Sequence, residues 1–312
     1  MSDSRRKCYS NTMKPNPFAA RLLLAWTILL AGLIGFWFFR PWFDALTWLN
    51  LQILSIFVSS KIAMLIVLDP ALRKQLTLAR LIAYLLWPGM EPKLFAPGRS
   101  IPSPELSPQW TGCIANLLTG SAMTWLLPLA FPQDTPVLLR AWVGLIGLFF
   151  FVAFGLTDLW VLLYQKMGIA VEKLWLNPAA ATGLAEFWGK RWNRVYSGML
   201  REIAFVPLMR RIGTKWAMFA VFIYSGVLHE IASVAAASGY GGPFLYFMVQ
   251  AIAFRMEETA WGRRKLRGHP FAGRCWTFLI VVGPLPLLVQ PEFLLRAMAP
   301  MLVFFRVPGL DS

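Results

Sequence analysis

Long apolar runs dominate the chain and set its expected architecture. Eight segments approach or reach the ~20 residues that a helix needs to cross a bilayer, at residues 18–39, 46–68, 110–131, 137–163, 214–237, 243–256, 275–289 and 292–308. The segments 243–256 and 275–289 are short, so we expect either of these helices to be broken or tilted. The pattern predicts an all-α, polytopic membrane helix bundle of about eight spans, forming a single domain over residues 1–312.

Two connecting segments differ from simple loops. Residues 81–92 are apolar but too short to cross, and they end in Trp87-Pro88-Gly89-Met90, which indicates a re-entrant or interfacial helix. Residues 92–109 contain five prolines and are expected to form a Pro-rich cytoplasmic linker rather than a domain boundary.

The basic residues predict the orientation of the bundle. A net charge of +15 would suit a nucleic acid, but lysine and arginine cluster between the apolar runs, so we expect no nucleic-acid partner. Segments 164–215 and 255–274 hold nine and six of them, whereas 40–45, 132–136 and 238–242 hold only Arg40. Positive charge gathers on the cytoplasmic side of membranes. We therefore expect the basic N-terminus (1–17) and the segment 164–213 to be cytoplasmic or interfacial.

Composition agrees with lipid as the main solvent. Hydrophobic residues make up 57% of the chain and charged residues only 14%, against about 25% charged in soluble domains. The apolar run after the basic N-terminus is too long for a signal peptide and lacks a small-residue cleavage site, which indicates an uncleaved first span. We expect a multi-pass protein of a bacterial inner membrane or, in a eukaryote, of the endoplasmic reticulum.

His229 is the first candidate for chemistry. It is one of two histidines and lies within the apolar segment 214–237, where an ionisable side chain is costly and indicates function. Small residues stand three and four positions before and after it, so it belongs to a face that packs tightly or lines a cavity. Interhelical hydrogen bonding is the alternative explanation. Glu230 points elsewhere and is expected to serve structure or orientation.

A second group of side chains precedes the same span. Trp188 and Trp192 are predicted to be i, i+4 neighbours on one helical face, surrounded by Lys190, Arg191 and Arg194. Taken alone, this pattern is also typical of an interfacial amphipathic helix with an aromatic belt. Cys8, Cys113 and Cys275 have no metal-type spacing, and two histidines cannot build a haem or metal site, so we expect no metal or cofactor.

Together these motifs resemble the membrane-bound O-acyltransferases, in the branch that contains plant-type wax synthases. The similar elements are the Trp-Pro-Gly-Met segment at 87–90, Phe-Trp-Gly-Lys-Arg-Trp-Asn at 187–193 and Ser-Gly-Val-Leu-His-Glu at 225–230. The resemblance implies a helical fold around a reaction chamber, acyl-CoA as donor, His229 as catalytic residue and Asn193 as the second active-site residue. It further implies substrate contacts from Trp188, Lys190, Arg191, Trp192, Ser225, Gln250 and Glu257, although the family's plainer pattern has two arginines where Lys190 and Arg191 stand.

The chemistry fits these residue types independently. A neutral imidazole can take the proton of an attacking hydroxyl, and an amide can donate to a developing oxyanion. The implied acceptor is a lipophilic, long-chain alcohol that yields a wax ester, with sterols or secondary-metabolite alcohols left open. A transporter or flippase is an alternative, although repeated halves with broken helices are missing from the sequence. A non-catalytic membrane protein of the same fold is another, against which the intact His229 and Asn193 argue.

Overall fold

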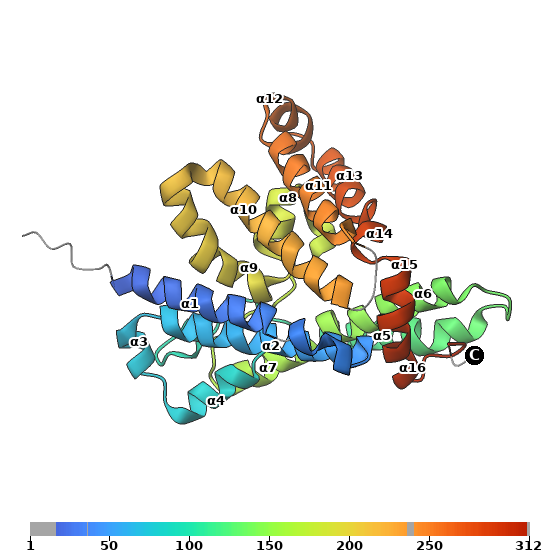
Figure 1. Cartoon of the computed structure of the whole chain (residues 1–312), viewed down its shortest axis with the longest axis horizontal. Coiled ribbons are helices and arrows are strands. Elements are labelled where there is room, and N and C mark those ends of the chain that lie inside the picture. Colours follow the sequence, from blue (N-terminus) through green and yellow to red (C-terminus); the bar gives the residue numbers. More distant parts are fainter. Residues whose placement is uncertain (1–16, 36, 236–239, 311–312) are drawn as a thin grey trace, which may run out of the picture.

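Every regular element that the structure describes is a helix. The computed structural model describes residues 17–35, 37–235 and 240–310, and Figure 1 shows helices throughout these ranges. The basic N-terminal residues 1–16, with Cys8, lie outside the described residues. The predicted all-α class is confirmed.

The helical elements come in three types. The α-helices are α1 (Pro17–Ile34), α2 (Ala45–Val67), α3 (Pro70–Lys74), α4 (Leu78–Leu86), α5 (Trp110–Ser121), α6 (Val137–Phe149), α7 (Thr157–Lys166), α8 (Leu184–Glu186), α9 (Arg194–Leu200), α10 (Val206–Ala235), α11 (Gly242–Glu257), α12 (Ala260–Gly262), α13 (Pro270–Val282), α14 (Leu285–Leu288), α15 (Pro291–Phe293) and α16 (Ala299–Phe304). The 3₁₀ turns are η1 (Trp37–Trp42), η2 (Pro92–Phe95), η4 (Leu127–Ala130) and η6 (Pro178–Ala180). The π turns are η3 (Ala122–Leu126), η5 (Phe150–Leu156), η7 (Phe187–Arg191), η8 (Arg201–Phe205), η9 (Arg263–Arg267) and η10 (Leu294–Met298).

Within the described ranges, six helical runs are long and apolar enough to cross a membrane. They are Pro17–Trp42, Ala45–Val67, Trp110–Ala130, Val137–Lys166, Arg194–Ser233 and Pro270–Leu288. Two of the eight expected segments form shorter helices. The α11 helix has 16 residues, and at ~1.5 Å per residue it spans roughly 24 Å of a ~30 Å hydrocarbon layer. The segment expected at 292–308 is divided among α15, η10 and α16. The segment expected at 275–289 belongs to the run Pro270–Leu288, within which α13 ends at Val282 and α14 begins at Leu285.

A sharp bend divides the run Arg194–Ser233 into two legs. Gly213 has φ 80° and ψ 161°, a conformation that glycine adopts without a side-chain clash. The second leg starts where the sequence predicts a span to start, at residue 214. The first leg was expected to belong to a cytoplasmic or interfacial segment. Residues 194–212 are instead helical and pack on α1 and α2 through Met199 and Ile203. Figure 1 shows the two legs diverging from the bend.

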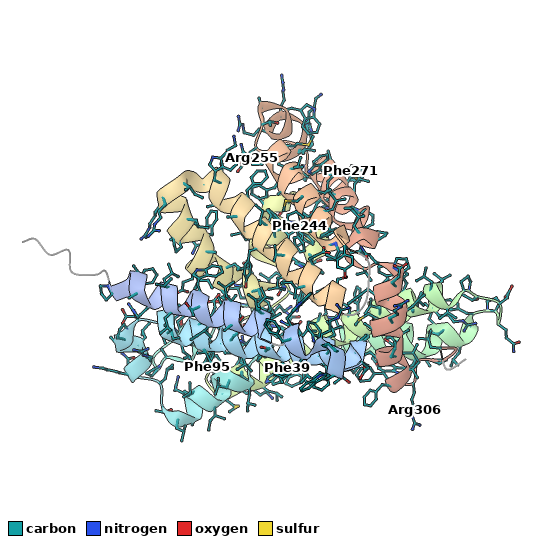
Figure 2. The ribbon with its side chains drawn as sticks, viewed as in Figure 1. Phe39, Phe95, Phe244, Arg255, Phe271 and Arg306 are labelled. Carbon is teal, nitrogen blue, oxygen red and sulfur yellow. The ribbon has the colours of Figure 1, made fainter. Side chains whose placement is uncertain are left out.

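The short helix α4 has the surface of an interfacial element. Leu78 and Leu86 are 73% and 62% exposed, whereas Tyr84 and Trp87 are buried. Between Phe95 and Trp110 the chain is irregular, as the prolines of this linker predict. Large apolar side chains cover much of the outside of the bundle, including Phe271, which is 79% exposed and labelled in Figure 2. Such a surface suits lipid contact.

Candidate active site

The His229 ring lies against the neighbouring helix α11. Its centroid is 4.6 Å from that of the Phe247 ring, with an angle of 43° between the planes. Gly226, one turn earlier, permits this approach, because a Cβ there would lie 3.0 Å from the Phe244 ring and 3.4 Å from Cβ of Phe247. The small-residue face predicted around His229 is therefore a close helix–helix contact.

A hydrogen bond fixes the tautomer of His229. Nδ1 lies 2.8 Å from the carbonyl oxygen of Ser225. Because a carbonyl oxygen can only accept, Nδ1 carries the proton, and Nε2 of the neutral ring holds a free lone pair. The ring is half-buried. Ser225 thus contacts the histidine through its backbone.

Glu230 caps the helix that carries Phe247. Its carboxylate accepts hydrogen bonds from the backbone N–H of Gly241 at 2.6 Å and of Phe244 at 3.1 Å. These N–H groups belong to the first turn of α11, where intrahelical partners are missing and negative charge is favoured. Glu230 therefore holds α11 on α10, which agrees with the structural role expected from the sequence.

The α11 helix also binds the segment 184–192. The Trp188 indole N–H donates to Oε1 of Gln250 at 3.3 Å, and the Trp188 ring lies 5.9 Å from the Phe247 ring. At the end of the helix, Oε1 of Glu257 accepts from the backbone N–H of Leu184 at 2.7 Å. Phe247 thus lies between the tryptophan of one motif and the histidine of the other, and the two motifs meet at this side chain.

Residues 187–191 form one π turn, which corrects the expected helical face. The turn is closed by a 2.8 Å hydrogen bond from the backbone N–H of Trp192 to the carbonyl of Phe187, and Trp192 is extended. The rings of Trp188 and Trp192 consequently meet at 77°, with centroids 6.5 Å apart, instead of lining one face. The Trp192 ring stacks between Phe187 at 5.3 Å and Phe149 at 5.5 Å.

Asn193 stands at a left-handed corner of the backbone, with φ 45° and ψ 56°. The segment 172–177 runs alongside and clamps the corner. The Leu176 N–H donates to the carbonyl of Arg191, and the Arg194 N–H donates to the carbonyl of Leu174, both at 2.9 Å. The Asn193 backbone carbonyl starts α9, while its side-chain amide forms no hydrogen bond with any described residue. The amide is therefore free to donate.

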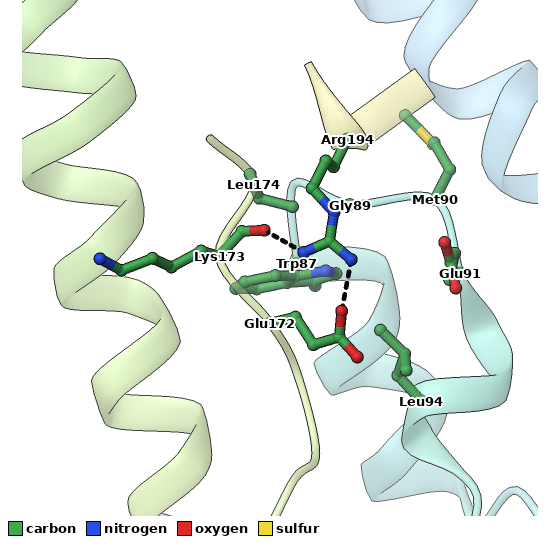
Figure 3. Close-up of a pocket in the computed structure, with 9 residues that line it drawn as sticks. All are labelled: Trp87, Gly89, Met90, Glu91, Leu94, Glu172, Lys173, Leu174 and Arg194. Atoms are coloured by element: carbon green, nitrogen blue, oxygen red, sulfur yellow. Dashed lines mark hydrogen bonds and ion pairs between the residues drawn. The ribbon is translucent and has the colours of Figure 1, made fainter. Parts of the chain in front are cut away.

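Two arginine side chains strengthen this clamp. Arg191 binds Glu186 with Nε at 2.8 Å and a terminal nitrogen at 2.6 Å. Arg194 binds Glu172 at 2.5 Å and the carbonyl of Lys173 at 2.8 Å, as Figure 3 shows. Burial alone would raise the pKa of Glu186, but hydrogen bonds from Thr182 and Arg191 outweigh it and hold that pKa below its ordinary value.

The two basic side chains before the Asn193 corner, Lys190 and Arg191, differ in their environment. Arg191 is committed to Glu186, whereas Lys190 is exposed and forms no ion pair within the part of the chain that the structure describes. Lys190, where the resemblance led us to expect an arginine, is therefore the more exposed of the two basic side chains.

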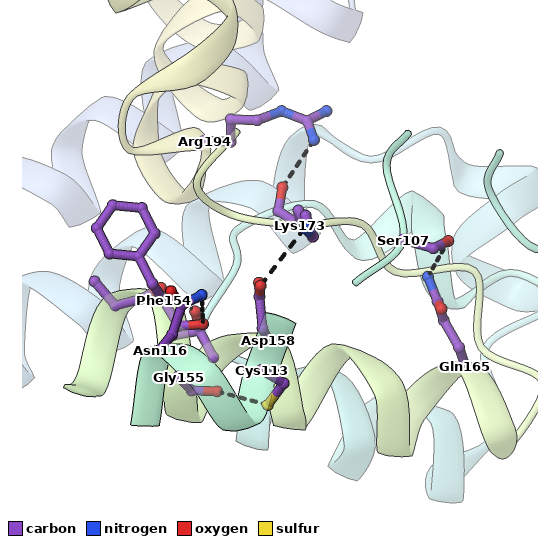
Figure 4. Close-up of polar contacts among 11 residues, drawn as sticks. Ser107, Cys113, Asn116, Phe154, Gly155, Asp158, Gln165, Lys173 and Arg194 are labelled. Carbon is purple, nitrogen blue, oxygen red and sulfur yellow. Dashed lines mark hydrogen bonds and ion pairs between the residues drawn. The ribbon is translucent and has the colours of Figure 1, made fainter. Parts of the chain in front are cut away.

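A buried carboxylate, which the sequence analysis did not predict, pairs with a lysine of the clamp segment 172–177. Asp158 of α7 is 4% exposed, and its Oδ2 lies 3.7 Å from the ammonium nitrogen of Lys173, as drawn in Figure 4. Nearby, Cys113 donates from its thiol to the carbonyl of Gly155 at 3.3 Å, within the packing of α5 against η5. The signal for Asp158 was an acidic residue inside the run 137–163.

The structure groups the predicted site residues around two centres. The His229 and Trp188 rings contact Phe247, with Ser225 bonded to His229 and Gln250 bonded to Trp188. The residues Arg191, Trp192 and Asn193 belong to the clamped corner. Measured along the helix from Gly213 at ~1.5 Å per residue, Asn193 and His229 lie roughly 30 Å and 24 Å from the bend. The two centres are thus at comparable distances along the two legs. Within the described residues no hydrogen bond joins the Asn193 and His229 side chains.

Comparison with known proteins finds similarity to one family in this region. A model of the "Membrane bound O-acyl transferase family" matches residues 171–249. The protein is 40% identical over 55 residues to "Probable long-chain-alcohol O-fatty-acyltransferase 7" of Arabidopsis thaliana. This match covers 18% of this chain and 16% of that protein. It is 36% identical over 67 residues to "Probable long-chain-alcohol O-fatty-acyltransferase 9" of the same plant. This match covers 20% of this chain and 20% of that protein.

The matched part is short but contains both candidate residues. No more than 20% of either relative's length is covered, so these relatives describe a region and not the whole chain. Residues 171–249 include the clamp, Asn193 and His229. The resemblance that the motifs indicated is confirmed for this region: residues 171–249 are similar to the membrane-bound O-acyltransferases.

Proposed function

We propose that the protein is an O-acyltransferase that moves an acyl group from acyl-CoA to the hydroxyl of a lipophilic alcohol, with His229 as general base. The observation that carries this proposal is the hydrogen bond from Nδ1 of His229 to the Ser225 carbonyl. It leaves Nε2 as the basic nitrogen of a half-buried ring within an apolar helical run. The names of the two plant relatives support a long-chain alcohol as acceptor.

The proposed reaction needs only one proton carrier. Nε2 of His229 takes the hydroxyl proton while the alcohol oxygen attacks the thioester carbonyl. The tetrahedral intermediate then collapses, the carbon–sulfur bond breaks, and the thiolate of CoA receives the proton from the imidazolium. The products are the ester and CoA, and the histidine returns to its starting state. The bond between Nδ1 and Ser225 keeps the ring oriented through both transfers.

Asn193 is proposed to bind the developing oxyanion or to orient the acyl carbonyl. Its amide has no hydrogen-bond partner among the described residues, while the clamp of residues 172–177 fixes its backbone. A preorganised donor stabilises a transition state more than a mobile one, because it needs no reorganisation as charge develops. Lys190, exposed next to the corner, is the basic side chain available for a phosphate of CoA.

Purified protein in detergent or proteoliposomes tests this function directly. With a radiolabelled long-chain acyl-CoA and hexadecanol, we expect ester and free CoA to form in equal amounts. His229→Ala should lower the rate by about 100-fold or more, as for loss of a general base. His269→Ala is the matched control, since that ring is exposed at the start of α13, and it should retain the wild-type rate. Failure to form an ester with hexadecanol, a sterol or any other lipophilic alcohol would refute the function.

A further inference from the structure

Lys61 is a buried cation that the acyl-transfer scheme does not use. It is 1% exposed and lies in α2, inside the apolar run Ala45–Val67. An ammonium group at such a position is costly unless its donors are satisfied, and it is a marker of function or of a specific structural task.

Three backbone carbonyls satisfy all three donors of this ammonium group. Nζ donates to the carbonyl oxygens of Tyr84 at 2.8 Å, Trp87 at 2.6 Å and Gly89 at 2.5 Å. The ring of Tyr84 lies 4.0 Å from Nζ, where its negative face adds attraction. Within the described residues no carboxylate pairs with Lys61. Among the described residues, the charge is held by carbonyl dipoles and by the rings of Tyr84 and Phe57.

Two of these carbonyls, those of Tyr84 and Trp87, stand at the C-terminal end of α4, and the Tyr84 carbonyl also accepts from the Trp87 N–H at 3.2 Å. The α4 helix ends at Leu86, and the last carbonyls of a helix have no intrahelical donor and carry partial negative charge. Lys61 therefore acts as a C-terminal cap for α4, supplied by another helix. The same contact fixes the turn Trp87–Met90, because two of the three carbonyls belong to it.

The turn that Lys61 fixes packs against α9, the helix that follows Asn193. Met90 belongs to the same buried cluster as Met199, and the carboxylate of Glu91 occupies the space that a Cβ of Gly198 would need. Trp87, Gly89 and Met90 line one side of a pocket whose other side includes Arg194 (Figure 3). The turn thus packs along α9, from the pocket beside Arg194 to the contacts at Gly198 and Met199.

We infer that Lys61 is a positioning residue for acyl transfer: by capping α4 it holds the turn Trp87–Met90 against α9, and so keeps the Asn193 corner in place. The inference rests on the proposed function for its catalytic consequence. Its structural part, the coupling of residues 84–91 to residues 191–197 through one ammonium group, stands on the contacts alone. Loss of the ammonium should loosen both segments.

Hydrogen exchange measured by mass spectrometry, together with steady-state kinetics, tests this inference. Lys61→Met keeps the length of the side chain and removes its donors and charge. Lys74→Met is the matched control, because Lys74 is exposed at the end of α3. For Lys61→Met we expect amide exchange to be about tenfold faster or more in residues 84–91 and also in 191–197. The kcat should fall roughly 10- to 100-fold, with the Kd for acyl-CoA changed by less than a factor of about three.

Several outcomes would overturn the inference. One is faster exchange confined to residues 84–91, which would make Lys61 a local cap only. Another is a kcat within about twofold of that of Lys74→Met. If Lys61→Met fails to accumulate, Lys61→Gln, which keeps two N–H donors without the charge, replaces it in both measurements. If the wild type forms no ester, the proposed function fails, while the exchange comparison still decides whether Lys61 couples the two segments.

Discussion

Replacement of Asn193 by glycine separates the chemistry of its amide from the shape of its backbone. Asn193 has φ 45°, a left-handed conformation that costs most L-residues about 1–2 kcal/mol and costs glycine nothing. Asn193→Gly therefore keeps the corner and removes the amide. Asn193→Ala removes the amide and strains the corner, so a loss of rate in that variant alone would have two explanations.

The expected size of the effect follows from the free amide and the fixed corner. Loss of one oxyanion donor typically costs about 100- to 1,000-fold in kcat, or roughly 2.7–4 kcal/mol. Glycine gains freedom in the unfolded chain but adopts the left-handed conformation without strain, so Asn193→Gly should change the free energy of unfolding by no more than about 1 kcal/mol. The clamp hydrogen bonds on both sides of the corner use backbone atoms and survive the substitution. Catalysis should therefore fall far more than stability.

The matched control lies in the same clamp. Asn177 is also left-handed, with φ 44°, but it is exposed. Asn177→Gly should leave kcat within about twofold of the wild type, since it removes no oxyanion donor. Both variants are assayed for kcat and KM with a fixed alcohol, and for thermal unfolding in detergent. Equal rates for Asn193→Gly and Asn177→Gly would refute the proposed role of the Asn193 amide.

Two further predictions concern the frame of the site. Glu230→Ala removes the carboxylate that accepts from Gly241 and Phe244, and it should destabilise the protein by about 1–3 kcal/mol in thermal unfolding; Glu105→Ala in the exposed linker is the control, and an equal melting temperature for the two would contradict the capping role. Ile212→Cys, next to the Gly213 bend and in a background without Cys8, Cys113 and Cys275, should react with an impermeant thiol reagent only from the cytoplasmic side, as the distribution of basic residues predicts; labelling from the opposite side alone would reverse the orientation.

Hydropathy predicted the long apolar helices, which are recognisable from their length and composition. It did not predict segments whose backbone conformation depends on particular hydrogen bonds. Apolar runs located α1 and α2 within a few residues, and a change in polarity located the start of the second leg at residue 214. The π turn at 187–191 was not predictable from side-chain spacing, because it depends on which carbonyl the Trp192 N–H selects. The clamp was missed for the same reason, since it pairs residues 172–177 with residues that follow much later in the chain.

The site residues divide in a similar way. His229 was singled out as a candidate because an ionisable ring in an apolar run is visible in the sequence, and Asn193 because its motif resembles one of a known family. Phe247 was not found, since one phenylalanine among many apolar neighbours has no local signal. Lys61 was passed over as an isolated charge in an apolar run, because its three partners belong to the end of a different helix and become a binding site only in the fold.

The π turn at Phe187–Arg191 also constrains how this region can change in length. A π turn contains one residue more than the α turn it replaces, with its hydrogen bond five positions apart instead of four. Deletion of a single residue here would let the turn close as an ordinary α turn with no loss of helicity. It would also rotate everything after it by about 100° relative to what precedes. Surface loops often tolerate insertions and deletions, but a change of length between Glu186 and Asn193 would move Asn193 from its corner. We therefore expect the seven-residue interval between these two positions to be constant.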